Sequence, residues 1–142
     1  MKLKTILLAD DNQNDIDLTI LALSEFNLAN NIEVVNDGVE VLEYLRSQGK
    51  FKGRKPGNPA VILLDLKMPR MDGIEVLKHI KNDPVLKIIP IVMVTSSREE
   101  SDLVQSYKLG VNGYVVKPVD FNQFITAIKQ LGAFWAVLNE IP

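Results

Sequence analysis

The sequence predicts an α/β fold, a doubly wound five-stranded parallel sheet with five helices. Two observations lead to this prediction. Short apolar runs alternate five times with segments of helical periodicity, which is typical of parallel strands joined by crossover helices. Runs such as Val61–Leu64 are also apolar throughout, as expected for strands buried on both faces of a sheet. We expect the flavodoxin-like strand order 2-1-3-4-5, which makes the first and third strands neighbours.

The strands and the first two helices follow from their residue patterns. The five expected strands cover residues 4–9, 32–35, 60–64, 90–94 and 112–117. A first helix over 14–27 is indicated by three apolar residues at positions i, i+4 and i+7, namely Ile16, Ile20 and Leu23. A second helix over 38–48 is expected to turn three side chains inward, those of Val41, Leu42 and Leu45.

The next two helices are predicted from their end signals. The third, over 73–83, opens with Asp72-Gly73-Ile74-Glu75 and stops before Pro84. Ser97 to Glu100 has the spacing of a capping box, so we expect the fourth helix to start there and to end at Gly110.

Asp120 is expected to cap the fifth helix. The apolar positions of this helix are Phe121, Phe124, Ile125, Ile128 and Leu131. The tail over 132–142 is predicted to extend it, and much of this tail is apolar all round, whereas a helix on one sheet face needs only an apolar stripe. Exposed apolar surface marks interfaces, and Phe134 and Trp135 are suitable anchors. The alternative is that the tail folds back and completes the core.

Length and composition suit a single soluble domain over 1–142, with a core over about 3–131. The net charge of −2 gives no argument for nucleic acid, and the absence of cysteine excludes disulfides and thiolate metal sites. The longest apolar run, Ile88 to Val94, contains Pro90 and is too short to cross a membrane. We therefore expect a cytoplasmic protein with neither nucleic acid nor membrane as a partner.

One long connection, Gly49 to Pro59, carries four basic residues and no acid. These residues are Lys50, Lys52, Arg54 and Lys55. A solvated surface loop explains them, because loops are commonly polar. The alternative is a docking strip for an acidic partner.

Polar residues follow four of the predicted strands where those strands end. Asp10 and Asp11 follow the first strand, Asp65 follows the third, and the fourth and fifth end at Thr95 and Lys117. The carboxyl ends of parallel strands line the ligand crevice of an open α/β sheet, so these side chains are expected to converge. Any one of them could be an ordinary turn or cap residue, but four junctions together indicate one site.

These residue types suit phosphoryl chemistry. Mg2+ prefers oxygen ligands, so Asp11 and Asp65 could bind it directly and Asp10 through water. The ion would screen Asp65 from its acidic neighbours and let its carboxylate attack an electron-poor phosphorus. Lys117 could offer a positive charge, and Thr95 a hydroxyl hydrogen bond, to the phosphoryl oxygens.

Four motifs resemble those of the receiver domain of two-component response regulators. They are Leu8–Asn12 (LADDN), Leu64–Gly73 (LDLKMPRMDG), Val94–Ser97 (VTSS) and Gly113–Pro118 (GYVVKP), and their order and spacing cover about residues 3–131. The resemblance implies that Asp65 accepts a phosphoryl group from a histidine kinase. It assigns Mg2+ to Asp10, Asp11 and Asp65 with the backbone carbonyl of Lys67. It also implies that the protein is a signalling partner rather than an enzyme with turnover.

The resemblance also implies a switch. It makes Thr95 the switch hydroxyl, Tyr114 the switch aromatic and Lys117 the phosphate-contacting cation, with a cis Lys117–Pro118 bond. Phosphate on Asp65 would draw Thr95 toward it and leave space for Tyr114 to turn inward. The side chain of Lys67, two residues after Asp65, is expected to alter the lifetime of the acyl phosphate.

With no room for an output domain, the output is expected to be binding. The tail and the basic loop resemble the small regulators paired with bacterial phytochrome kinases. A light-sensing histidine kinase is then the expected partner, and a homodimer is expected through the fourth and fifth helical faces and the Phe134/Trp135 tail.

Three other functions use similar elements. A haloacid-dehalogenase-like phosphatase also needs a nucleophilic Asp, but Asp65-Leu66-Lys67 lacks the second acid of its Asp-x-Asp motif. A flavodoxin-like flavin binder needs a phosphate loop after the first strand, where this chain has the acidic segment 10–15. A receiver-like scaffold that is never phosphorylated is the third alternative, and the full set of site residues argues against it.

Overall fold

The computed structural model describes residues 5–24, 31–118, 122–123 and 126. Its five strands are β1 Ile6–Ala9, β2 Ile32–Val35, β3 Val61–Leu64, β4 Ile91–Thr95 and β5 Gly113–Val116. All four neighbouring pairs are parallel, and the order is β2-β1-β3-β4-β5, so the predicted sheet and strand order are confirmed. The shared register of β1 and β3 aligns Ala9 with Leu64, which brings the two strand ends side by side.

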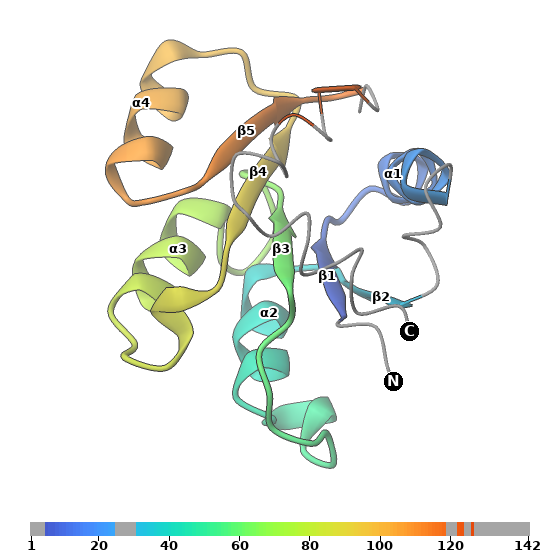
Figure 1. Ribbon diagram of the computed structural model, residues 1–142, viewed down its shortest axis with the longest axis vertical. Helices are drawn as coiled ribbons and strands as arrows, with labels where there is room; N and C mark the ends of the chain where they lie inside the picture. The colour runs from blue at the N-terminus through green and yellow to red at the C-terminus, as the bar shows by residue number, and fades with distance from the viewer. Residues whose placement is uncertain (1–4, 25–30, 119–121, 124–125, 127–142) are drawn as a thin grey trace.

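Side chains from alternate positions of the strands fill two cores, one on each face of the sheet. On β1, Leu7 and Ala9 pack into the core beneath α2 (Gly38–Leu45) and α3 (Gly73–Lys81). Ile6 and Leu8 pack into the opposite core with Ile16 and Leu23 of α1 (Gln13–Ser24). Figure 1 shows the same layering, with α1 on one side of the sheet and α2, α3 and α4 (Glu100–Lys108) on the other. The molecule is therefore doubly wound, as predicted.

Helices α1 to α4 occupy the predicted segments, and two short 3-10 turns join them, η2 Gly49–Phe51 and η3 Leu86–Ile88. Five of the six residues predicted to face inward on α1 and α2 are buried, and Ile20 is only partly buried. The helices also bury residues that the sequence analysis did not name, among them Thr19, Ala22 and Tyr44. The fifth helix lies mostly outside the described residues, as do Asp120, the listed apolar positions and the tail over 132–142. None of the helices in the described part of the chain is both long and apolar enough to span a membrane.

Helix α2 ends at Leu45, three residues before the predicted end. The backbone reverses there, because Ser47 adopts a left-handed φ of 51° and Gly49 one of 56°. Helix α3 begins as predicted, with the Asp72 side chain accepting a hydrogen bond from the Glu75 N–H at 2.9 Å.

The predicted capping box of α4 is wrong. Helix α4 starts after Glu99, which caps it without a side-chain hydrogen bond. Ser97 lies two residues before Glu99, too early to cap the helix, and its hydroxyl donates instead to the Asp102 carboxylate at 2.6 Å. The same hydroxyl accepts a hydrogen bond from the Glu99 N–H at 3.3 Å. The helix ends as predicted ahead of Gly110, whose φ of 96° favours glycine.

A close approach at Gly73 fixes the start of α3 against the end of β3. The Gly73 N–H donates to the Leu66 carbonyl at 2.7 Å. A Cβ on Gly73 would lie 2.3 Å from the Asp65 carbonyl oxygen. Glycine therefore lets α3 begin directly beside the segment that carries Asp65.

Candidate functional site

Three carboxylates converge at the carboxyl ends of β1 and β3, as the sequence predicted. Asp10, Asp11 and Asp65 each offer one oxygen to a group in which all such atoms lie within 4.8 Å of one another. Asp10 and Asp65 are buried, whereas Asp11 is exposed. The sheet ladder holds them, because the Asp65 N–H donates to the Ala9 carbonyl at 3.0 Å.

Lys117 joins this cluster from the end of β5. Its ammonium lies 2.6 Å from Asp10 Oδ2 and 2.8 Å from Asp65 Oδ2, and its side chain is only 7% exposed. A third carboxylate, that of Asp15, lies 3.0 Å from the same Nζ. The Lys117 N–H donates to the Thr95 carbonyl at 2.9 Å, and the Lys117–Pro118 bond is cis, as the resemblance implied. An ammonium has three N–H donors, so these three carboxylates can engage all of them.

Burial and charge act in opposite directions at this site. Burial raises the pKa of the Asp65 carboxyl; the Lys117 ammonium counteracts this only in part, and the Asp10 charge adds to the rise. Burial lowers the pKa of Lys117, but its hydrogen bonds to Asp10, Asp65 and Asp15 outweigh burial and raise that pKa above its ordinary value. Lys117 is therefore positively charged, and it is the cation that the buried carboxylates contact.

The acidic cluster fits a hard divalent cation. Three carboxylates, those of Asp10, Asp15 and Asp65, contact one ammonium, and Asp11 adds a fourth carboxylate beside Asp10 and Asp65, so negative charge is in excess. The atoms that the three clustered carboxylates offer to a metal ion are all oxygens, and Mg2+ prefers oxygen ligands. Lys67 lies beside them, with its N–H directed at Asp65 Oδ1 at 3.4 Å and its side chain exposed. The assignment of its backbone carbonyl to the metal remains a prediction.

Thr95 and Tyr114 are linked through the loop that follows β4. Thr95 is buried at the end of β4, and its hydroxyl accepts a hydrogen bond from the Ser97 N–H at 3.3 Å. The Tyr114 hydroxyl, from β5, donates to the Ser97 carbonyl at 3.2 Å. The two predicted switch side chains therefore both contact the backbone of Ser97, Thr95 at its N–H and Tyr114 at its carbonyl. Tyr114 is partly buried, and burial raises the pKa of its hydroxyl.

Sequence reasoning missed Asp15, which it treated only as part of an acidic loop. The Asn12 side chain caps α1 by accepting the Asp15 N–H at 3.0 Å, and this places Asp15 in the first turn. The signal available in the sequence was an acid in the first turn of a helix that starts directly after the site loop.

A second missed pair anchors the loop after β3. Arg70 has a left-handed φ of 64° and donates two hydrogen bonds to the Asp37 carboxylate, at 2.9 and 3.1 Å. Asp37 also caps α2 by accepting the Glu40 N–H at 2.8 Å. The neighbouring Asn36 donates from its side chain to the Asp10 carbonyl at 3.1 Å. The start of α2 therefore contacts both segments that carry the acidic cluster.

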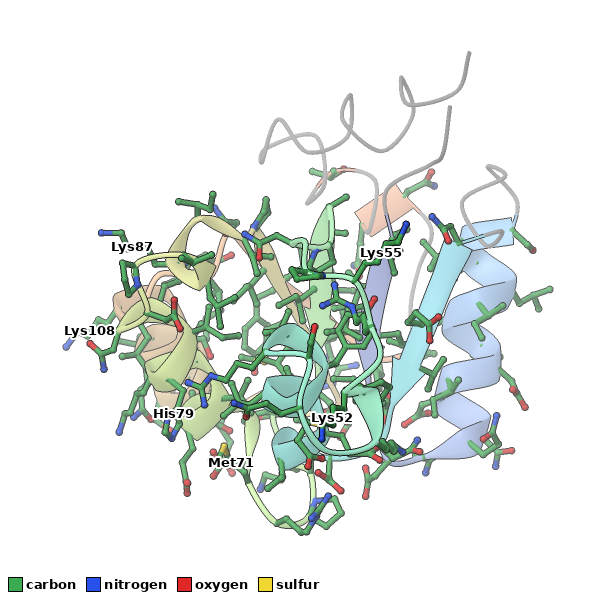
Figure 2. The ribbon with its side chains drawn as sticks, turned by 90° about the horizontal axis from the view of Figure 1, so that it is seen from below. Lys52, Lys55, Met71, His79, Lys87 and Lys108 are labelled. Atoms are coloured by element: carbon green, nitrogen blue, oxygen red, sulfur yellow. The ribbon has the colours of Figure 1, made fainter. Side chains whose placement is uncertain are left out.

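Two of the four basic residues in the 49–59 loop are used within the fold. The Arg54 guanidinium lies 3.9 Å from the centre of the Tyr44 ring and donates to the Tyr44 carbonyl at 2.9 Å. Lys50 forms an ion pair with Glu40. Lys52 and Lys55 are exposed, and Figure 2 shows them on the loop after α2. The exposure of Lys52 and Lys55 fits a solvated surface loop. If the loop docks an acidic partner, these two lysines are the basic residues that would contact it.

Comparison with known proteins matches this chain to one family. The sequence model of the response regulator receiver domain matches residues 6–129. The response regulator Rcp1 of Synechocystis sp. is 34% identical over 98% of this chain and 93% of its own length. The chain is also similar to the probable methanogenesis regulatory protein FilR2 of Methanothrix harundinacea, at 34% identity over 96% of this chain and 86% of that protein.

Solved structures of response regulators are also similar to this chain. The bacteriophytochrome response regulator RtBRR is 56% identical, with a TM-score of 0.88 over 99% of this chain and 85% of its own. The Mn2+-bound form of Rcp1 gives a TM-score of 0.76 at 34% identity, over 94% of each chain. A phosphorylated cyanobacterial phytochrome response regulator, RcpA, gives 0.77 at 40% identity, also over 94% of each chain.

Proposed function

The chain belongs to the response regulator receiver domain family, and on that premise we propose that Asp65 accepts a phosphoryl group from a histidine kinase in a Mg2+-dependent reaction. The observation that carries the proposal is the convergence on Asp65 of Asp10, Asp11 and the Lys117 ammonium. The domain is proposed to extend over 1–142 and to act alone, with 132–142 as a helical extension.

The transfer is a displacement at phosphorus. An Asp65 carboxylate oxygen forms a bond to phosphorus while the bond from phosphorus to the kinase histidine nitrogen breaks, and the electron pair of that bond stays on the imidazole. Asp10, Asp11, Asp65 and the Lys67 carbonyl would hold Mg2+, which neutralises charge on the phosphoryl oxygens when bound. Lys117 Nζ, 2.8 Å from Asp65 Oδ2, adds a positive charge beside the reacting carboxylate.

The switch follows from the contacts of Ser97. A hydroxyl that turns toward the phosphoryl group must give up the 3.3 Å hydrogen bond from the Ser97 N–H. The Ser97 carbonyl is the acceptor of the Tyr114 hydroxyl, so the movement of Thr95 changes the partner that holds Tyr114. Phosphate thereby shifts a pre-existing equilibrium of the surface formed by α4 and β5.

The output is proposed to be binding through this surface. Val104 and Tyr107 on α4 are 43% and 48% exposed, and a groove of about 520 Å3 lies between Tyr107 and Tyr114. A homodimer through the α4 and fifth-helix face, with Phe134 and Trp135 of the tail as anchors, would cover such apolar surface. Those two anchors lie outside the described residues.

The similarity to the bacteriophytochrome response regulator RtBRR and to the phytochrome response regulator RcpA supports a phytochrome-type histidine kinase as the partner. A phosphatase of the haloacid-dehalogenase type is less well supported. It needs a general acid two residues after its nucleophile, and that position holds Lys67, a cation with an exposed side chain.

The test is to incubate the protein with Mg2+ and a small acyl-phosphate donor, and to compare intact mass and oligomeric state with Asp65→Asn. The proposal expects one added phosphoryl group on the wild type only, loss of that gain when Mg2+ is chelated, and a change in self-association. Equal mass gain by Asp65→Asn, or none by the wild type with any donor, would contradict it. Continuous hydrolysis of a small phosphate ester would favour the phosphatase instead.

A further inference from the structure

We propose that Asp15 is a positioning residue that keeps the Lys117 ammonium at the site when a divalent cation occupies the acidic cluster. The inference rests on the proposed function, since it concerns the same site. Its starting point is that Lys117 Nζ contacts three carboxylates, those of Asp10, Asp65 and Asp15, at 2.6, 2.8 and 3.0 Å.

These three acceptors are not equivalent. Asp10 and Asp65 belong, with Asp11, to the group whose oxygens lie within 4.8 Å of one another, and Asp15 does not. The Asp10 and Asp65 side chains are 2% and 8% exposed, whereas that of Asp15 is 31% exposed, at the outer side of the ammonium. Among the described residues, Asp15 is thus the one carboxylate on Lys117 that is not also a metal candidate.

This difference matters once a cation is bound. A divalent cation polarises the Asp10 and Asp65 oxygens toward itself, and it repels the neighbouring ammonium. Both effects weaken two of the three contacts that hold Lys117 in the apoprotein. The Asp15 carboxylate keeps its full charge for the ammonium, so it holds Lys117 within reach of the phosphoryl oxygens that this side chain has to contact.

The position of Asp15 is fixed independently of Lys117. The Asn12 side chain accepts the Asp15 N–H at 3.0 Å, and the Asn12 N–H donates to Asp10 Oδ1 at 3.0 Å. Lys117 belongs to a different element, since it follows β5 directly. The contact therefore joins the first turn of α1 to the end of β5, and it orients Lys117 from a rigid helix start.

A purely structural role for Asp15 has to be separated from this one. An acid in the first turn stabilises a helix through its dipole, whatever lies nearby. Asp17, just after the first turn, provides a control that is matched in charge. It lies on the same helix and carries the same charge, but it is exposed and accepts a hydrogen bond from the Gln13 side chain at 2.9 Å instead.

The first test observes the Lys117 ammonium directly by 1H–15N NMR, with its signal assigned by its absence from Lys117→Gln. We expect the wild type and Asp17→Asn to keep the protected signal with and without Mg2+. Asp15→Asn should keep it without Mg2+, held by Asp10 and Asp65, and lose it when Mg2+ is added. Retention of the signal by Mg2+-loaded Asp15→Asn overturns the proposal, as does its loss from the wild type on Mg2+ addition.

The second test measures phosphorylation by a small acyl-phosphate donor over a range of Mg2+ concentrations. At saturating Mg2+, Asp15→Asn should be slower by roughly three- to tenfold, the loss expected for one partly exposed charge-assisted hydrogen bond. The half-saturating Mg2+ concentration should change less than the rate, Asp15→Glu should recover part of the rate, and Asp17→Asn should match the wild type. A change confined to Mg2+ affinity, or an equal loss in Asp17→Asn, overturns the proposal. A wild type that is never phosphorylated contradicts the proposed function, whereas the NMR comparison does not depend on phosphorylation.

Discussion

Arg70 donates two hydrogen bonds to Asp37, at 2.9 and 3.1 Å, and so connects the loop after β3 to the residue that caps α2. The loop that Arg70 belongs to contains Lys67 and follows Asp65 directly. Arg70 adopts a left-handed φ of 64°, an uncommon conformation for a residue with a side chain. This pair therefore fixes the loop that follows Asp65. Its contribution to the stability of the fold can be measured as a function of pH.

Asp37→Asn should lower stability by about 1 kcal/mol at pH 7, because asparagine keeps the cap on α2 but loses the charge that Arg70 contacts. Burial raises the pKa of Asp37, but the Glu40 N–H and the Arg70 guanidinium outweigh burial and lower it below 3.8. A lowered pKa means that the carboxylate stabilises the fold above its unfolded pKa and loses this effect as pH falls through the folded one. Urea unfolding should therefore show a difference between variant and wild type that shrinks below pH 3.8. A difference of the same size at pH 7 and pH 3 would contradict this account.

Gly73→Ala should destabilise the protein by about 2 kcal/mol, within the range for an added group in a packed position. The new Cβ would lie 2.3 Å from the Asp65 carbonyl oxygen, so either α3 or the segment carrying Asp65 has to move. Phosphorylation should slow for the same reason. Gly53→Ala is the control, because a Cβ on Gly53 would meet no atom within 4 Å. Equal urea midpoints for the two variants would refute the prediction.

Asp11→Asn should remove most of the thermal stabilisation that Mg2+ gives, while leaving the Tm without Mg2+ nearly unchanged. Asp11 is exposed, so the apoprotein loses little, but the metal loses one of three convergent carboxylates. The mechanism predicts that wild-type Tm rises with Mg2+ because ligand binding stabilises the folded state. Differential scanning calorimetry with Mg2+ and with a chelator checks this, and Asp17→Asn serves as the charge-matched control. If Mg2+ raised the Tm of Asp11→Asn as much as that of the wild type, Asp11 would not be a metal ligand.

Tyr114→Phe should cost about 0.5 to 1 kcal/mol, as expected for one partly buried hydrogen bond to the Ser97 carbonyl. Asp65 should still gain one phosphoryl group, since Tyr114 does not belong to the acidic cluster. The change in self-association on phosphorylation should diminish, because the acceptor that couples Thr95 to Tyr114 has lost its donor. Intact mass and light scattering on the same samples separate these effects. An unchanged response of the oligomer would show that the hydroxyl has no part in the switch.

The polar strand ends were predictable from sequence, because alternation of strands and helices fixes which ends share an edge of the sheet. Asp10, Asp65 and Lys117 were placed together on this basis alone, although Lys117 lies far along the chain from the other two. The exact partners of Lys117 were not predictable in the same way. Asp15 contacts it only because Asn12 caps α1 and turns the first helical turn toward the site.

Local patterns failed where two partners competed for one side chain. Ser97 has the spacing of a capping residue, but its hydroxyl donates a hydrogen bond to the Asp102 carboxylate, and the helix starts later. Arg54 in the basic loop stacks on Tyr44, a contact that depends on where α2 ends. Both outcomes depend on the three-dimensional placement of a partner, which spacing along the chain does not encode.

The central claim is that Asp65 is the phosphoryl acceptor, and chemical trapping tests it most directly. An acyl phosphate on an aspartate is reduced by borohydride to homoserine, whereas a free carboxylate and a phosphoester are not. After incubation with Mg2+ and an acyl-phosphate donor, peptide mass spectrometry should find homoserine at position 65 and nowhere else. Homoserine at another aspartate, or none in a sample whose intact mass shows phosphorylation, would contradict the account.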